Sequence, residues 1–336
     1  MPARVLVAPD SFKGTLPAWE VAAACAEGVA LAGCDPEPCP VADGGEGTMR
    51  ILVEALGGRV VQRRATDPLG RPLDAALGIA GSEAIVEVAE ASGLGLLAPS
   101  ERDPERTSTT GTGELLIAAR DLGARRILVA AGGSATVDGG AGAIGFISAN
   151  GGLAGCRLTV LCDVETVFED APGMYGPQKG ASPEAVRRLE ARLEHLAAEF
   201  RRDPRGLPLS GAAGGLSGGL WAAFGAELVP GADFVLGAVG FDRRLDRVDA
   251  VIVGEGCLDS QSFAGKILGR IAARCRRSAL PVHAIVGSSR VSPTEAVELG
   301  LASVRVASSR GEIVAAAREL GAGLKPTGAA RGFEQA

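Results

Sequence analysis

The stretch that decides the fold is GGSATVDGGAGAIG, residues Gly132 to Gly145. It follows the apolar run RILVAA, residues 126–131, which is typical of a buried strand in a parallel sheet. Residues 141–148 then read as the start of a helix. A strand that ends in glycines and opens into a helix points several backbone N–H groups at one place, which suits a phosphate or a carboxylate. The stretch therefore predicts an α/β unit with an anion-binding loop.

Five positions in this stretch carry the predicted chemistry. Gly132 and Gly133 let the chain turn sharply and let a ligand approach the backbone, because glycine has no Cβ. Ser134 and Thr136 add hydroxyl donors, and Asp138 adds a carboxylate for a metal ion or a proton. The alternative is a tight strand-to-helix turn in which the Ser, Thr and Asp side chains only cap the helix. We favour ligand binding because similar loops recur along the chain.

The composition excludes several classes of protein. The chain has 336 residues, of which 46% are hydrophobic, so it is long enough for two domains or for one large domain with an insertion. The net charge is −6, aromatic residues make up 4%, and no cluster of Lys and Arg forms a nucleic-acid footprint. No apolar run approaches the length of a membrane span. We expect neither a nucleic-acid partner nor a membrane partner, and the oligomeric state stays open.

The cysteines and histidines narrow the function further. The seven cysteines include no CxxC pair, which favours small buried thiols in a reducing compartment. The two histidines, His195 and His283, lie in no zinc-binding pattern. The N-terminus begins directly with a strand pattern and shows no secretion signal. We therefore expect a cytoplasmic protein without a zinc site.

The N-terminal part repeats one plan of strand, polar loop and helix. In open parallel sheets such loops gather at the carboxyl ends of the strands, where ligands bind. The first two units place strands at 4–8 and 37–42, polar loops at 9–15 and 43–48, and helices at 18–31 and 48–55.

The pattern changes in the middle of the chain and then returns. Residues 59–66, 72–79 and 84–88 read as strands joined by turns with no helix between them, which predicts an antiparallel meander. Near the C-terminus, the strand at 248–253 and the polar loop at 254–266 match the N-terminal units in style. Both ends of the chain are therefore predicted to build one sheet.

This arrangement predicts the domain organisation. We expect an α/β fold in which residues 1–60 and 241–336 form a discontinuous, Rossmann-like parallel-sheet domain. Residues 61–240 form a second α/β domain inserted into the first.

The loops combine glycines, acids and a few lysines. Backbone amides and lysines spread the charge of phosphates, while carboxylates hold Mg²⁺ and one of them orients or deprotonates a hydroxyl nucleophile. This combination is what phosphoryl transfer from a magnesium nucleotide requires. No Walker A sequence is present, so a kinase of this kind is not of the P-loop type. The acids beside the loops are Asp10, Asp43, Glu46, Asp138, Asp163, Glu255 and Asp259, and the lysines are Lys13, Lys179 and Lys266.

A second pattern points elsewhere. Gly140, Gly142 and Gly145 satisfy GxGxxG, and Asp163 lies 18 residues beyond, as in a dinucleotide site. However, the residues SATVD separate the strand from the first glycine of the pattern, whereas a Rossmann turn follows its strand directly. We rank this dehydrogenase hypothesis below the anion-loop hypothesis.

Several motifs, in order, resemble the bacterial glycerate kinases over nearly the whole chain. They include APDSFKGTL (8–16), ADGGEGT (42–48), TDPLG (66–70), TSTTGTGEL (107–115), YGPQKGA (175–181), GAAGGL (211–216) and GAELVPG (225–231). The resemblance implies two α/β domains with the active site in the cleft between them. It implies ATP-dependent phosphorylation of D-glycerate with Mg²⁺, with 2-phosphoglycerate favoured over 3-phosphoglycerate as the product.

The chain departs from the family pattern at three positions. Val137 stands where the family typically has Asn, Cys257 where it often has Arg, and Ser260 where it often has Gly. The departures at Val137 and Cys257 motivate the alternative that the protein is a catalytically silent, metabolite-binding homologue. An NAD-dependent dehydrogenase is the third hypothesis.

The predicted site residues fall into three groups. Lys13, Asp43, Asp163 and Asp259 are the candidate catalytic residues, and Asp138, Asp163 and Asp259 are the candidate metal ligands. We expect Lys13 and Lys179 to clamp phosphate or carboxylate groups. The candidates for binding substrate or nucleotide are Asp10, Ser11, Gly44, Gly45, Thr109, Gly132, Gly133, Ser134, Thr136, Lys179, Gly214, Gly215, Glu255, Gln261 and Lys266.

Overall fold

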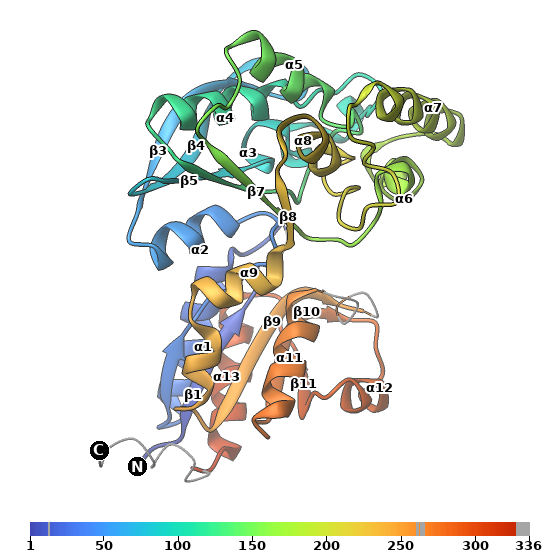
Figure 1. Ribbon diagram of the computed structural model, residues 1–336. Coiled ribbons are helices and arrows are strands. Elements are labelled where there is room, and N and C mark those ends of the chain that lie inside the picture. Colours follow the sequence, from blue (N-terminus) through green and yellow to red (C-terminus); the bar gives the residue numbers. More distant parts are fainter. Residues whose placement is uncertain (13, 260–261, 263–265, 327–336) are drawn as a thin grey trace. The chain divides into compact units, whose positions relative to one another are not determined.

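The computed structural model divides the chain into two compact units (Figure 1). It describes residues 1–12, 14–259, 262 and 266–326. Unit 1 comprises Met1–Asp43 and Val235–Ala336, and unit 2 comprises Gly44–Phe234.

Unit 1 is built on a parallel sheet of five strands in the order β11-β10-β9-β1-β2. Strands from both ends of the chain form this sheet, as the sequence predicts. Val5 of β1 pairs with Pro36 of β2 on one side and with Ala250 of β9 on the other. The strands are β1 (Arg4–Pro9), β2 (Asp35–Pro38), β9 (Ala250–Leu258), β10 (Val282–Ser289) and β11 (Ser303–Val306).

Two helices from opposite ends of the chain pack together in unit 1. Gly28 of α1 lies so close to α13 that an added Cβ would stand 2.3 Å from the Val314 carbonyl oxygen. The apolar side chains of α1 and α13 form one core cluster with Val5 and Val7 of β1. The helices of this unit are α1 (Ala18–Leu31), α10 (Phe241–Leu245), α11 (Ile267–Arg277), α12 (Pro293–Glu298) and α13 (Arg310–Gly323), and α9 (Gly231–Ala238) crosses from unit 2.

The strand order of unit 1 determines where a ligand would bind. The chain runs from β1 to β2 at one edge and then continues with β9 on the other side of β1. In open parallel sheets such a reversal leaves a crevice outside the carboxyl ends of the two strands. The loops after β1 and at the end of β9 therefore lie at the topological switch point.

Unit 2 contains a mixed sheet of six strands in the order β3-β4-β5-β6-β7-β8. The pairs β3–β4 and β4–β5 are antiparallel, which confirms the predicted meander, and β5 to β8 are parallel. The strands are β3 (Arg59–Thr66), β4 (Pro72–Ala80), β5 (Glu83–Glu87), β6 (Arg126–Ala130), β7 (Arg157–Cys162) and β8 (Glu227–Pro230).

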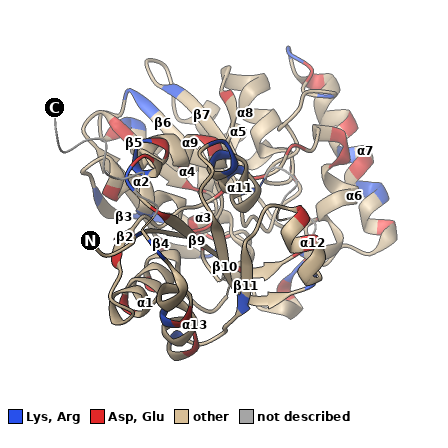
Figure 2. Ribbon diagram, turned by 90° about the horizontal axis from the view of Figure 1, so that it is seen from below, with Lys and Arg blue, Asp and Glu red and all other residues tan. Residues whose placement is uncertain are grey.

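The longest helix of unit 2 shows how sequence periodicity selects the buried face. Ser182 caps the first turn of α7 by accepting a hydrogen bond from the backbone N–H of Ala185. Ala185, Leu189, Leu193 and Ala197 recur every four residues and are buried, whereas the acidic and basic residues of the helix lie at other positions (Figure 2). The helices are α2 (Thr48–Ala55), α3 (Ala89–Ser92), α4 (Thr110–Asp121), α5 (Ala141–Ala149), α6 (Ala171–Tyr175), α7 (Pro183–Glu199) and α8 (Leu216–Phe224).

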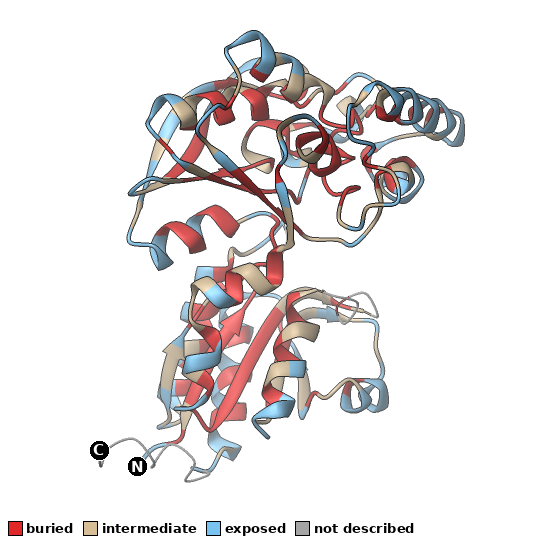
Figure 3. Ribbon diagram, viewed as in Figure 1, coloured by how far each residue is buried: buried red, intermediate tan, exposed pale blue. Residues whose placement is uncertain are grey.

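Each unit has its own apolar core (Figure 3). In unit 2, Val86, Ile127, Val129 and Val160 of the parallel strands are fully buried. Such continuous Val/Ile-rich strands are expected where helices cover a parallel sheet. Among the described helices, none combines the length and the apolar character needed to cross a bilayer.

The observed boundaries differ from the predicted ones at a few places. The units divide after residues 43 and 234, rather than 60 and 240, because α2 packs against β3, β4 and β5 of unit 2. β2 covers residues 35–38 instead of 37–42, since an edge strand tolerates the prolines of DPEP. β9 continues to Leu258 through glycines that suggested a loop from residue 254, because β10 pairs with it that far. β8 was missing from the prediction.

Candidate active site

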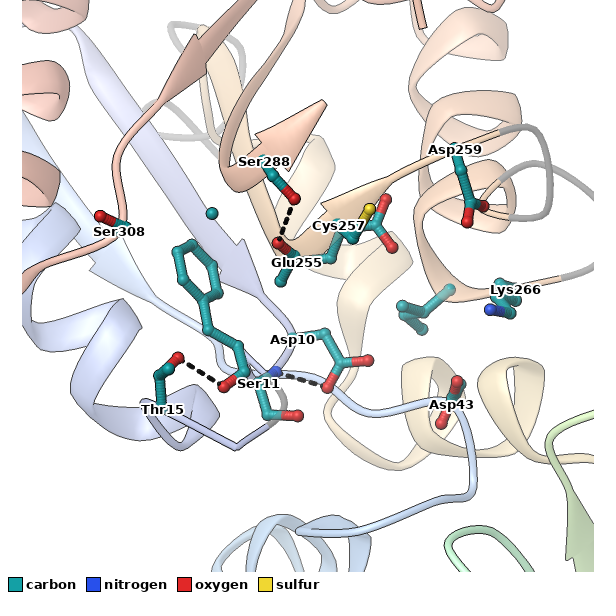
Figure 4. A pocket seen from close by; sticks show the side chains of 14 residues that line it. Asp10, Ser11, Thr15, Asp43, Glu255, Cys257, Asp259, Lys266, Ser288 and Ser308 are labelled. Carbon is teal, nitrogen blue, oxygen red and sulfur yellow. Dashed lines mark hydrogen bonds between the residues drawn. The ribbon is translucent and has the colours of Figure 1, made fainter. Parts of the chain in front are cut away.

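A cavity of about 410 Å³ lies at the topological switch point of unit 1 (Figure 4). Asp10 follows β1 directly and is held there because its N–H donates to the Gly254 carbonyl of β9 at 2.8 Å. The Asp10 carboxylate in turn accepts a hydrogen bond of 2.6 Å from the Ser11 N–H. The lining includes six predicted site residues, namely Asp10, Ser11, Asp43, Glu255, Asp259 and Lys266.

The charge of this cavity limits what it can bind. Four of the lining side chains are carboxylates, and Lys266 is the one cation among the described residues of the lining. Asp10 and Asp43 are only 7% and 6% exposed, so solvent screens them weakly. By Coulomb's law, a cavity with this lining disfavours a bare phosphate relative to one whose charge a divalent cation neutralises.

The turn that follows β1 is closed by its own backbone. The N–H of Phe12 donates to the Leu16 carbonyl at 2.8 Å, and the Thr15 hydroxyl donates to the Phe12 carbonyl at 2.8 Å. The Phe12 ring is 1% exposed and anchors the turn in the core of unit 1. The predicted site residues Lys13 and Gln261 lie outside the described residues.

A second group of predicted residues lies in unit 2, around Lys179. Lys179 is 4% exposed, and its Nζ donates to the Ser134 hydroxyl and to the Thr136 carbonyl, each at 2.8 Å. Burial lowers the pKa of this ammonium to about 8, although the charges of Asp163 and Asp138 oppose the effect. Of the three N–H groups on Nζ, one has no acceptor among the described residues. That donor is suited to an oxygen of an anionic ligand.

At the carboxyl ends of β6 and β7, the loops that follow these strands meet the loop that precedes α2. The Gly132 N–H donates to the Gly44 carbonyl at 3.2 Å. An added Cβ at Gly132 would stand 2.3 Å from the Gly45 Cα and 3.0 Å from Asp163 Oδ2. Gly133 has a φ of +72°, which favours glycine. The glycines at these positions therefore allow close packing of the loops beside the Asp163 carboxylate.

Asp138 holds two helix N-termini in place. Its carboxylate accepts hydrogen bonds from the Thr109 N–H at 2.9 Å and hydroxyl at 2.8 Å, and from the N–H groups of Gly140 at 3.0 Å and Gly142 at 3.2 Å. At 1% exposure, its oxygens are committed to these four donors. Asp138 therefore orders the starts of α4 and α5, and its predicted role as a metal ligand stays a prediction.

Several glycine-loop amides donate to acceptors within the protein. The Gly215 N–H donates to the Gly211 carbonyl at 3.1 Å, and the Gly139 N–H donates to the Gly214 carbonyl at 3.1 Å. An added Cβ at Gly214 would stand 2.0 Å from the Thr136 carbonyl oxygen. Gly214 thus packs the loop before α8 against Thr136 and Gly139, while Gly215 closes this loop on Gly211.

The sequence reasoning missed Glu87. This residue ends β5 and is 3% exposed. Its carboxylate accepts hydrogen bonds from the N–H groups of Gly47 and Met49 at the start of α2. Glu87 could have been found from its position at the carboxyl end of a parallel strand, beside β6 and its glycine loop. Its hydrogen-bond partner Gly47 lies 40 residues earlier in the chain and could be identified only from the structure.

Two of the three glycines of the GxGxxG pattern have packing roles, whereas an added Cβ at Gly145 would meet nothing within 4 Å. An added Cβ at Gly142 would stand 2.1 Å from the Ser108 hydroxyl oxygen, and one at Gly140 would stand 3.0 Å from the Leu216 side chain. Val137, one of the departures from the family pattern, is fully buried in an apolar cluster with Phe168 and Leu189. Cys257, another departure, lines the cavity of unit 1.

Known proteins match almost the whole chain. The sequence profile described as the glycerate kinase family matches residues 5–151 and 144–328. The glycerate kinase of Bacillus subtilis (strain 168) is 38% identical, and the glycerate 2-kinase of Escherichia coli (strain K12) is 36% identical, each over 85% of both sequences. A crystal structure assigned as glycerate kinase 2 of Salmonella typhimurium LT2 has a TM-score of 0.77 and 34% identity, and the match covers 96% of this chain and 98% of that one. With its α/β fold of two units and its acid-lined cavity at the switch point, the chain belongs to the glycerate kinase family.

Proposed function

We propose that the protein transfers the terminal phosphoryl group of ATP to a hydroxyl group of D-glycerate. The relatives named above are glycerate kinases, and one is a glycerate 2-kinase, which supports 2-phosphoglycerate as the product. The observation in this structure that carries the proposal is the cavity at the carboxyl ends of β1 and β9, lined by four carboxylates and Lys266.

The cavity of unit 1 fits a magnesium nucleotide. Mg²⁺ prefers hard oxygen ligands and uses one or two carboxylates together with phosphate oxygens and water. The described residues include no group of three or more His, Cys, Asp or Glu side chains arranged around one point, so a metal site made of protein ligands alone is not expected there. We propose that Asp43 and Asp259 hold Mg²⁺, which neutralises the phosphate charge that the carboxylates would otherwise repel.

The proposed reaction needs few protein groups. The bond from the γ-phosphorus to its bridging oxygen breaks, and a bond forms from that phosphorus to a hydroxyl oxygen of glycerate. The hydroxyl proton passes to a carboxylate, for which Asp10 is the buried candidate that is not a proposed Mg²⁺ ligand. Lys266 offers an ammonium to the phosphates, and in unit 2 Lys179 is proposed to bind an oxygen of an anionic ligand.

The test is a coupled assay of ADP release with the purified protein. We expect release that depends on both D-glycerate and Mg²⁺, and ³¹P NMR of the product distinguishes 2-phosphoglycerate from 3-phosphoglycerate. Binding of D-glycerate without ADP release would support the silent homologue instead. We also propose a cytoplasmic location, because all seven cysteines are free thiols, as a reducing compartment maintains them.

A further inference from the structure

The loop Gly44–Gly47 is held by a side chain from another part of unit 2. Glu87 Oε1 accepts a hydrogen bond of 2.9 Å from the Gly47 N–H, and Oε2 accepts one of 3.0 Å from the Met49 N–H. Gly47 is the N-cap residue of α2 and has no side chain with which to cap the helix. The Glu87 carboxylate therefore performs the capping that Ser, Thr or Asp performs in other helices.

The capped loop lies against the candidate site of unit 2. Gly44 accepts the Gly132 N–H, and Gly45 packs on Gly132 so tightly that no Cβ fits between them. Asp163 Oδ2 lies at the edge of the same contact. A loop that loses its anchor at Gly47 would loosen two residues away, where it touches the Gly132–Ser134 loop.

The surroundings of the Glu87 carboxylate disfavour its negative charge. Glu87 is 3% exposed, and burial raises its pKa to about 7, although the two backbone hydrogen bonds lower it. The acids Glu90 of α3 and Glu46 of the loop also raise the pKa, and Arg50 is the basic residue of α2. An ionised carboxylate accepts both N–H groups strongly, whereas a protonated one accepts them weakly.

We propose that Glu87 is a positioning residue, which fixes the Gly44–Gly47 loop against the Gly132–Ser134 loop and so orders the site for phosphoryl transfer. The kinetic part of this inference rests on the proposed function. The structural part, that Glu87 orders the loop, does not.

The structural part is tested on the wild-type protein by ¹H–¹⁵N TROSY spectra recorded between pH 5.5 and 8.5. The amide protons of Gly47 and Met49 are expected to shift together with a midpoint near 7, because both donate to one carboxylate. In the Glu87→Gln variant this shared transition should be absent. Amides that do not titrate together in the wild type would overturn the proposal, whether or not the protein phosphorylates glycerate.

The kinetic part uses Glu87→Gln and Glu87→Asp, with Glu83→Gln as the control. Glu83 lies on the same strand but pairs with Arg126 at its amino end, away from the loop. Losing a hydrogen bond to a charged group should lower kcat/KM of Glu87→Gln roughly tenfold to hundredfold, with partial recovery in Glu87→Asp. Its pH profile should also lose a rise near pH 7. Equal kcat/KM in Glu87→Gln, Glu83→Gln and an active wild type would refute the positioning role.

Discussion

Replacing Lys179 with Met tests whether a buried charge is kept at a cost in stability. Lys179 is 4% exposed, and burial lowers its pKa to about 8 from an ordinary 10.5. Below about pH 8 the ammonium is charged in both the folded and the unfolded chain, so the full desolvation cost is present. As the pH rises from about 8 to 10.5, the folded protein loses the proton first and the cost disappears. Folded stability due to Lys179 therefore increases with pH in this window.

The magnitude follows from the gap between the two pKa values. A difference from 10.5 to about 8 corresponds to about 3 kcal/mol at 1.36 kcal/mol for each pKa unit. Met has a similar length and no charge, so the Lys179→Met variant lacks this pH-dependent gain. At pH 7 the relief of desolvation is partly offset, because Ser134 and Thr136 lose the donor that they share.

The assay is urea unfolding of wild type and variant at pH 7 and pH 10. Between pH 7 and pH 10, we expect the free energy of unfolding of the wild type to increase by up to about 3 kcal/mol relative to that of Lys179→Met. Lys325→Met, at an exposed position, is the control and should follow the wild type. A constant difference between wild type and Lys179→Met would refute the reasoning. In the glycerate kinase assay we expect kcat/KM of Lys179→Met to fall by roughly 10²-fold or more, as for a lost charge-stabilising donor.

Four further predictions address the loops. Gly214→Ala should lower the free energy of unfolding by more than 2 kcal/mol, because its Cβ would meet the Thr136 carbonyl at 2.0 Å. Gly206→Ala is the control in the urea-unfolding assay, because Gly206 has a similar positive φ but open space around it, and its free energy of unfolding should fall by less. Asp138→Asn should cost about 2–4 kcal/mol in the same assay, since its amide nitrogen would face donors now bound by a carboxylate oxygen; unchanged stability would contradict the anchoring role. As the pH rises from 4.5 to about 7, the free energy of unfolding of the wild type should fall by up to about 3 kcal/mol relative to that of Glu87→Gln. The reason is that the pKa of Glu87 is raised in the folded protein, which therefore favours the protonated carboxyl. Lys13→Ala should lower kcat by orders of magnitude with an unchanged circular dichroism spectrum, and near-normal turnover would remove Lys13 from the site.

Local patterns in the sequence were sufficient for most of the fold. The helices at 18–31 and 48–55 have the predicted bounds because apolar spacing and glycine stops are local signals. The strand β9 was predicted too short because its glycines suggested a loop, whereas pairing with β10 keeps them in the sheet. Pairing depends on residues far away in the sequence, so a glycine within a strand and a glycine after it look alike.

The candidate sites also contain some features that local sequence predicts and others that it does not. The positions of Asp10 and Asp163, each directly after a strand of its own sheet, were predictable because polar residues that follow parallel strands gather at one edge of that sheet. The partners of the loop amides were not predictable. The four hydrogen bonds that Asp138 accepts from the starts of α4 and α5 could not be read from the sequence. Glu87 was overlooked because its acceptor role depends on a loop 40 residues earlier.

The buried charges indicate where this fold gives up stability for function. The glycine loops satisfy many of their own N–H groups, so the long-range attraction for an anionic ligand in unit 2 depends on side chains such as Lys179. For both Lys179 and Glu87, burial makes the charged form of the side chain less favourable by about 3 kcal/mol. Both residues lie next to the loops at the carboxyl ends of the parallel strands. An apolar residue at either position would remove that cost. Strongly perturbed ionisable groups gathered at one edge of a sheet are typical of sites that act on charge. Their burial therefore makes this edge of unit 2 the part of that unit where we expect an anionic ligand to bind, even though its glycine amides are largely occupied.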